Sequence, residues 1–264
     1  FGNEMELAVI PEKDGKTDVD ALKSMMTDDT ACVLIQHPNY YGNLEDAAEI
    51  GEIAHSVKNC KYVMSVNPVT LAVMKTPKEY GADMADGEGQ PLGLATAFGG
   101  PYLGFMASVD SMKRNLPGRI VGQTVDHNGK TGYVLTLQAR EQHIRREKAS
   151  SNICSNQALC ALTVGVYLSA MGNEGLKNVA TQCYSKAHYM AQKFAEIGFS
   201  IENQEFFHEF VTRSDKKSAD ILAALEEKGI LGGLPLDDNR ILWCCTEMNS
   251  KADIDEVIAT VKEV

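Results

Sequence analysis

The chain has 264 residues and a formal net charge of −11, which excludes the overall positive charge that a general nucleic-acid binder needs. A hydrophobic fraction of 44% and a charged fraction of 23% are typical of globular proteins and exclude a disordered chain. No apolar stretch approaches the roughly 20 residues that cross a bilayer. We therefore expect no membrane span, and from the negative net charge we expect no nucleic-acid partner.

The 7 cysteines and the first residues indicate the setting of the protein. The cysteines form no C-x-x-C pair and match no zinc spacing, and most lie in apolar runs, so we expect core thiols and no metal site. Residues 1–4 (FGNE) form no basic n-region of a secretion signal and include no initiator Met. We therefore expect a cytoplasmic protein and a chain taken from within a longer gene product.

Strands and helices alternate in the first part of the chain. We expect strands at residues 5–10, 31–35 and 62–66, and helices at residues 18–26 and 44–57. Buried strands separated by helical segments of about 10–15 residues predict βαβ units in a parallel sheet. Only two clear βαβ steps precede Gly81, so we expect further strands of this sheet to lie upstream of the chain.

Shorter strands follow Gly81. We expect them at residues 103–108, 119–124 and 132–137, with the last two joined by the hairpin signal Asn128-Gly129. Two helices are expected next, at residues 155–170, closed by Gly172, and at residues 174–197, followed by Gly198.

The end of the chain is typical of a small α+β unit. We expect strands at residues 199–201, 207–212 and 240–245, and helices at residues 218–228 and 252–261. The last helix opens with a capping box formed by Ser250 and Asp253. These patterns predict a large α/β domain over residues 1–150, connecting helices over residues 151–197 and a small C-terminal domain over residues 198–264.

Two glycine-rich segments invite a phosphate-binding interpretation. Residues 86–93 fail it, because G-x-G-x-x-G would require glycine at Leu92 and Pro91 stands where a helix should begin. Gly99 and Gly100 are explained first by a turn between strands; the functional alternative is an anion nest in which backbone N–H groups face a phosphate. The residues alone leave both interpretations open.

The densest charge cluster contains Arg140, His143 and Arg145. A solvated helix turn accounts for it, since opposite charges four residues apart support one another. A site for an anionic ligand or an acidic partner accounts for it too, because a polar tract follows at once.

His37 and Asn39 directly follow a predicted buried strand. Loops at the carboxyl ends of parallel strands are where open α/β sheets bind ligands. Pro38 and Gly42 are also typical of a plain turn. The only argument for a function of this segment is therefore its position at the end of a strand.

Four segments, in a fixed order, resemble one family. They are residues 87–93 (GEGQPLG), 98–105 (FGGPYLGF), 116–122 (LPGRIVG) and 138–149 (QAREQHIRREKA). They resemble the P-protein of the glycine cleavage system, glycine dehydrogenase (decarboxylating), and specifically the C-terminal part of subunit 1 of its two-chain bacterial form. The similarity spans nearly the whole chain and weakens after about Gly198.

The resemblance implies an α/β architecture of the fold-type-I pyridoxal-phosphate (PLP) transferases, with a partial large domain and a small α+β C-terminal domain. It implies an α2β2 heterotetramer with glycine dehydrogenase subunit 2 that decarboxylates glycine. The aminomethyl group then passes to lipoyl H-protein, and PLP supplies the electron sink.

PLP enzymes need a Lys for the Schiff base and usually an Asp beside the pyridinium nitrogen. The strand that should end in the Asp ends in Asn67, and Gln90 stands near the Lys position. No Lys lies between Lys78 and Lys113. We therefore expect this chain to hold no catalytic residue and no covalent cofactor, the isolated fragment to be inactive, and the sister subunit to bind PLP.

The chain would then complement its partner. The resemblance implies that Gly99 and Gly100 contact the cofactor site of the partner. His37, Asn39, Arg140, His143 and Arg145 would line the interface or contact substrate.

Two other functions remain open at this stage. A free-standing PLP-dependent aminotransferase or lyase would need an imine-forming Lys, and the candidates sit badly relative to the strands: Lys61, Lys75, Lys78 and Lys113. A non-catalytic regulatory or binding homologue fits the missing Lys and Asp equally well.

Overall fold

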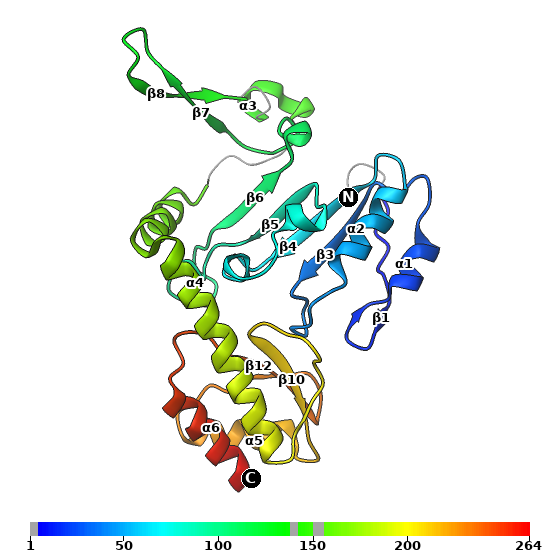
Figure 1. Ribbon diagram of the computed structural model, residues 1–264, viewed down its shortest axis with the longest axis vertical. Coiled ribbons are helices and arrows are strands. Elements are labelled where there is room, and N and C mark those ends of the chain that lie inside the picture. The colour runs from blue at the N-terminus through cyan, green and yellow to red at the C-terminus, as the bar shows by residue number, and fades with distance from the viewer. Residues whose placement is uncertain (1–4, 138–141, 150–155) are drawn as a thin grey trace.

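The computed structural model describes residues 5–137, 142–149 and 156–264 and divides their strands among two four-stranded sheets and two hairpins (Figure 1). In the larger sheet, β3 (Cys32–His37), β4 (Lys61–Val66) and β5 (Met84–Glu88) run parallel. β6 (Gly104–Ser108) pairs antiparallel with β5 and completes the order β3-β4-β5-β6. The strands predicted at residues 31–35, 62–66 and 103–108 are confirmed as β3, β4 and β6.

Helices cover one face of this sheet. Along β3 every second side chain is buried, and the buried set packs with Ile50 and Ala54 of α2 (Ala47–Ser56) and Leu22 of α1 (Val19–Met25). Asp18 starts α1 by accepting hydrogen bonds from the N–H groups of Asp20 and Ala21. The alternate side chains of β3 are exposed, and Leu34 keeps 58% of its surface accessible in the described part of the chain.

The strand predicted at residues 5–10 is wrong. Those residues pair with no described strand, and Leu7 and Val9 are 74% and 80% exposed. The chain instead forms a small hairpin of β1 (Glu12–Lys13) and β2 (Lys16–Thr17) at Asp14-Gly15. A β-branched apolar run becomes a strand only where a neighbouring strand takes up its backbone hydrogen bonds.

The second hairpin projects from one end of the molecule (Figure 1). Its strands β7 (Ile120–Val125) and β8 (Thr131–Thr136) pair antiparallel around Asn128-Gly129, as predicted. The short α3 (Gln142–Arg145) follows it along the chain. Single-turn 3-10 helices lie at η1 (Thr70–Ala72), η2 (Pro77–Tyr80), η3 (Asp110–Met112) and η4 (Arg146–Lys148).

A long helix, α4 (Ala158–Glu196), links the larger sheet to the C-terminal part (Figure 1). Gly172 interrupts it with φ 60° and ψ −174°, so the helix consists of two segments, as the glycine predicted. Val164 and Val179 come from opposite sides of this break and share one buried cluster with Val69, Leu92 and Phe207.

The C-terminal sheet is antiparallel, with the order β11-β12-β10-β9. Its strands are β9 (Ser200–Ile201), β10 (Glu209–Arg213), β11 (Leu234–Pro235) and β12 (Arg240–Cys244). α4, α5 (Ser218–Glu227) and α6 (Lys251–Glu263) pack on one face, around Phe194, Phe210 and Trp243. The capping box of Ser250 and Asp253 is present at α6, as predicted. β11 was not predicted.

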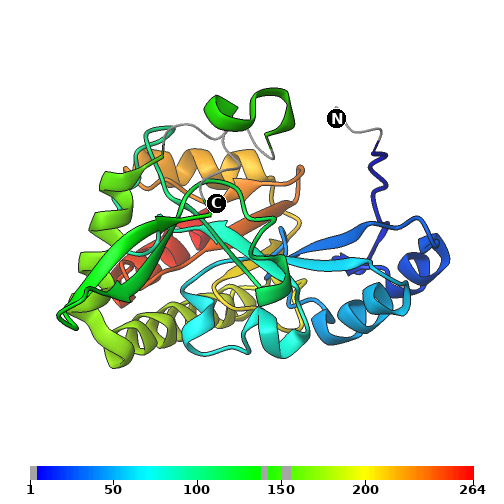
Figure 2. The same ribbon diagram turned by 90° about the horizontal axis from the view of Figure 1, so that it is seen from above.

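The loop after β3 joins the two sheets. Asn43 forms a β-bridge with Phe206, and the N–H of Leu44 donates to the carbonyl of Glu205 at 3.2 Å. Gly42, at φ 83°, approaches so closely that a Cβ there would lie 2.0 Å from the carbonyl oxygen of Glu209. Figure 2 shows the larger sheet and the C-terminal part from above. The domain limits at residues 150 and 197 remain predictions.

Candidate functional site

The carboxyl ends of the parallel strands gather three of the predicted site residues at one edge of the larger sheet. His37 ends β3, Asn67 follows β4, and Gln90 lies just beyond β5. Open α/β sheets bind ligands at this edge. The chemistry available here depends on how each of these side chains is already engaged.

His37 is buried, with 4% of its surface exposed. Its Nδ1 accepts a hydrogen bond from the N–H of Glu45 at 3.2 Å, so the proton of the neutral ring lies on Nε2. Nε2 is buried without a hydrogen-bond partner among the described residues. Burial, with a smaller contribution from the charge of Lys16, lowers the pKa of His37 to about 4. The ring is therefore neutral at pH 7.

Asn39 holds the loop that follows β3. Its Nδ2 donates to the carbonyl of Gly15 and to Oε1 of Glu45, both at 2.7 Å. Its Oδ1 accepts from the N–H groups of Tyr41 and Asn43, both at 3.0 Å. This amide fixes the backbone of the loop beside His37, and its predicted contact with substrate or partner stays a prediction.

Asn67 caps the turn after β4. Its Oδ1 accepts from the N–H of Val69 at 3.0 Å, and its Nδ2 lies 3.4 Å from Nε2 of His208. His208 comes from the C-terminal part of the chain, 141 residues away. The sequence pattern did not identify His208, because no local spacing joins it to Asn67.

Gln90 is also engaged with backbone. Its Nε2 donates to the carbonyl of Leu94 at 2.7 Å, and its N–H donates to Oε1 of Glu88 at 3.0 Å. Oε1 of Glu88 accepts in addition from the N–H of Leu103 at 2.8 Å. The two positions closest to the expected Lys and Asp thus carry neutral amides, and these residues do not fit covalent capture of PLP.

Gly99 and Gly100 lie in an exposed turn. Gly99 has φ 105°, and the N–H of Gly100 donates to the carbonyl of Ala97 at 3.1 Å. The Gly100 donor therefore closes the turn in this conformation. The anion-nest interpretation stays a prediction.

The charge cluster is described only in part. His143 and Arg145 are exposed in and at the end of α3, whereas Arg140 lies outside the described residues. Their role at an interface is not tested by these positions.

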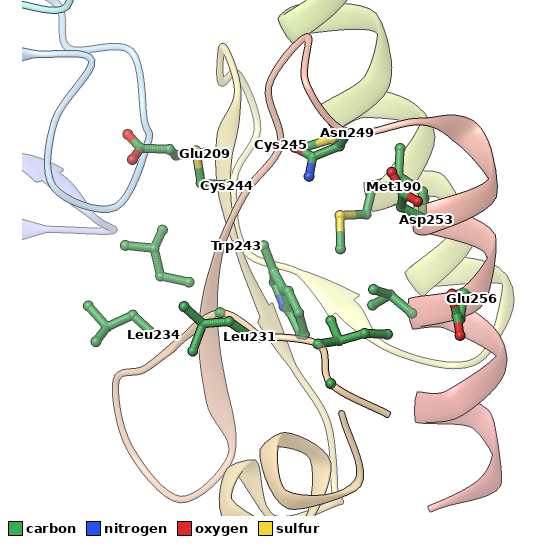
Figure 3. A pocket seen from close by; sticks show the side chains of 17 residues that line it. Met190, Glu209, Leu231, Leu234, Trp243, Cys244, Cys245, Asn249, Asp253 and Glu256 are labelled. Carbon is green, nitrogen blue, oxygen red and sulfur yellow. The ribbon is translucent and has the colours of Figure 1, made fainter. Parts of the chain in front are cut away.

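A pocket in the C-terminal part is a further feature that the sequence did not indicate (Figure 3). This pocket lies beside β12. Its lining includes Met190, Glu209, Leu231, Leu234, Trp243, Cys244, Cys245 and Asp253. Figure 3 shows Glu209 and Cys244 adjacent to one another, on the opposite side of Trp243 from Met190 and Asp253. Gln90 is not among the residues that line this pocket.

The arrangement of sheets and helices is that of the fold-type-I PLP-dependent enzymes. Solved structures that share it include an aspartate aminotransferase from Thermus thermophilus, with a TM-score of 0.64 and 16% identity over 94% of this chain and 67% of that chain. Another is a C-DES mutant with glycine covalently linked to its PLP cofactor, with a TM-score of 0.64 and 14% identity over 93% of this chain and 64% of that chain. At such identity the likeness shows the fold alone.

The chain belongs to the glycine cleavage system P-protein family, whose model matches residues 3–261. It is 48% identical to the probable glycine dehydrogenase (decarboxylating) subunit 1 of Moorella thermoacetica, over all of this chain and 61% of the relative. It is 49% identical to the protein of the same name from Desulfitobacterium hafniense, over 98% of this chain and 60% of the relative.

A solved structure of the same family superimposes closely. The glycine decarboxylase (P-protein) of the glycine cleavage system, in inhibitor-bound form, has a TM-score of 0.91 and 37% identity. The alignment covers 99% of this chain and 60% of that one. The chain thus spans about three fifths of the length of the proteins it matches. In its described part, no helix is long and apolar enough to cross a membrane.

Proposed function

We propose that this chain is part of the first subunit of a two-chain glycine decarboxylase. Glycine would be decarboxylated by the assembled enzyme, and the aminomethyl group would pass to lipoyl H-protein. The observation that carries this proposal is the match along the whole chain to proteins named subunit 1, a name that implies a partner subunit.

The partner subunit would carry the PLP. At the carboxyl edge of this sheet, Asn67 and Gln90 present amides that are hydrogen-bonded to backbone. An amide nitrogen forms no imine with an aldehyde, and a neutral amide does not stabilise a protonated pyridine nitrogen as a carboxylate does. These two side chains support a complementary role, in which the chain shapes the active site of its partner.

A reconstitution assay tests the proposed activity. The full-length subunit that contains this chain would be co-expressed with its partner and assayed for exchange of labelled bicarbonate into glycine in the presence of H-protein. We expect exchange with both subunits and none with either alone. A complex that forms but catalyses no exchange would contradict the proposal.

Reduction with borohydride tests where the cofactor is held. The assembled enzyme would be loaded with PLP, reduced and digested, and the modified lysine would be located by mass spectrometry. We expect the adduct in the partner subunit. An adduct at a lysine of this chain would favour a free-standing PLP enzyme instead.

The interface residues can be tested in the same complex. Gly100→Val would place a side chain against Ala97, whose Cβ lies 2.7 Å from the position of an added Cβ. If the glycine turn faces the cofactor of the partner, this variant should weaken PLP binding and lower turnover, while Gly129→Ala in the hairpin should leave both unchanged. An unchanged PLP affinity in the Gly100→Val variant would contradict the anion-nest interpretation.

A further inference from the structure

His208, Glu209 and Cys244 bring three kinds of metal-binding side chain together between the two sheets. Glu209 and Cys244 are directly opposite each other in the β10–β12 ladder, and His208 immediately precedes Glu209. One ligand atom from each residue lies within 4.8 Å of the other two. Figure 3 shows Glu209 and Cys244 next to each other.

A buried ring nitrogen of His208 points independently to a bound ligand. The residue is 8% exposed, and its Nδ1 is buried without a hydrogen-bond partner in the described part of the chain. Leaving a buried polar atom unpaired costs about 1–3 kcal/mol, so an unpaired buried nitrogen calls for a partner such as a bound ion or a water molecule. The other ring nitrogen lies 3.4 Å from Nδ2 of Asn67, which is long for a hydrogen bond.

We propose that His208, Glu209 and Cys244 bind a divalent transition-metal ion of the zinc type. Imidazole nitrogen, thiolate sulfur and carboxylate oxygen are the ligands that Zn²⁺ takes in proteins, and one thiolate with one carboxylate balances its charge. Mg²⁺ and Ca²⁺ prefer oxygen ligands only, so the imidazole and the thiol select against them.

The cluster needs only a small adjustment to close around an ion. Ligand atoms on a tetrahedral zinc ion, with bonds of about 2.0–2.3 Å, lie about 3.3–3.8 Å apart. The ligand atoms lie within 4.8 Å of one another and would have to move closer by about 1 Å to reach this spacing. Cys244 is an exposed residue, and in a zinc site with three protein ligands a water molecule takes the fourth position.

Asn67 lies beside the second nitrogen of the His208 ring and offers it a donor, not the acceptor that a metal-bound ring needs. A histidine that binds a metal through Nδ1 carries its proton on Nε2 and donates it to an acceptor. Asn67 presently turns Nδ2 toward that nitrogen, because its Oδ1 accepts from Val69. Asn67→Asp would place a carboxylate there, and we expect it to tighten metal binding by about 10-fold or more.

Cobalt spectroscopy on the untagged chain tests the site. Co²⁺ added to the reduced, metal-free protein should give a thiolate-to-cobalt charge-transfer band and the visible bands of a tetrahedral ion, saturating at one ion per chain. Zn²⁺ should displace it. Cys244→Ser should abolish the charge-transfer band, whereas the matched control Cys32→Ser, which removes another exposed thiol, should retain it.

Affinities measured with Zn²⁺ complete the test. Glu209→Gln should weaken binding by at least about 10-fold, and Asn67→Asp should change it in the opposite direction, with folding checked by circular dichroism. No charge-transfer band in the parent chain, or a band that survives Cys244→Ser, would overturn the proposal. Metal binding is measured on the chain alone, so its failure leaves the proposed glycine decarboxylase activity untouched.

Discussion

Nδ2 of Asn203 donates to Oδ1 of Asn43 at 2.8 Å and joins residues 160 positions apart in the chain. The same nitrogen donates to the carbonyl of Tyr41 at 2.8 Å, and Oδ1 of Asn203 accepts from the N–H of Val211 at 2.7 Å. Asn203 is 8% exposed, so this one amide satisfies buried polar groups of both the β3 loop and the C-terminal sheet.

Asn203→Ala should therefore lower the free energy of unfolding by about 2–4 kcal/mol, because it leaves several buried donors and acceptors unpaired. Urea denaturation would measure the loss. The control Gln192→Ala removes an amide whose bond to Glu196 is exposed, and we expect a change within about 0.5 kcal/mol. Equal effects of the two substitutions would contradict this account.

Gly42→Ala should destabilise the chain by about 3 kcal/mol or more, because the new Cβ would collide with the Glu209 carbonyl and the residue is held at φ 83°. Gly129→Ala is the matched comparison. Gly129 also has positive φ, at 77°, but an added Cβ would meet nothing within 4 Å, so about 1 kcal/mol is expected. Thermal unfolding of both variants would separate close approach from backbone strain.

His37 predicts a pH dependence of stability. The pKa of His37 is about 4 in the folded chain, against an ordinary value of 6.5. Between these two pH values the imidazole is protonated in the unfolded chain and neutral in the folded chain. The free energy of unfolding should accordingly rise with pH from about 4 to 6.5, by about 3 kcal/mol. Urea titrations at stepped pH would measure it.

His37→Asn is the variant that isolates this effect. Its Oδ1 can replace Nδ1 as acceptor for the N–H of Glu45, while the side chain no longer titrates. The slope of stability against pH should become less steep across that interval but not vanish, because burial also lowers the pKa of His208 to about 4. A slope identical to that of the parent chain would assign the pH dependence to other groups.

Thr212→Val tests the polar contact inside the C-terminal core. Nε1 of Trp243 donates to Oγ1 of Thr212 at 2.8 Å, and both residues are almost fully buried. Valine keeps the shape and removes the acceptor, so a loss of about 1–3 kcal/mol is expected, whereas Thr212→Ser keeps the hydroxyl and should preserve the bond. The chain contains 1 Trp, so its fluorescence reports directly on this contact.

Much of the fold could be predicted because its local signals agree with the final structure. The strands at Cys32–His37 and Lys61–Val66, the helix break at Gly172 and the capping box at Ser250 follow from patterns of a few residues. The strand expected at residues 5–10 failed because apolar β-branched composition does not supply a neighbouring strand. Asp14-Gly15, which turns the hairpin that does form, is a signal that the sequence contained.

The candidate sites were less predictable for a different reason. The positions of Asn67 and Gln90 followed from strand order, but their hydrogen bonds to Val69 and Leu94 did not. Nothing near His208 in the sequence points to Cys244, which the pairing of β10 with β12 brings close, or to Asn67, which comes from the other sheet. Contacts between residues far apart in the sequence leave no local pattern from which they could be predicted.

The strand Glu209–Arg213 has a consequence for insertions and deletions. Phe210 and Thr212 face the helices, while Glu209 lies against the β3 loop. Both faces of this strand are therefore packed against other parts of the chain. Adding or deleting a single residue between Asn203 and Glu209 would invert every side chain downstream in the strand, placing phenylalanine where the loop docks and a carboxylate inside the hydrocarbon interior. Length variation among related proteins should therefore be absent from this short stretch and tolerated in the Asn128-Gly129 turn.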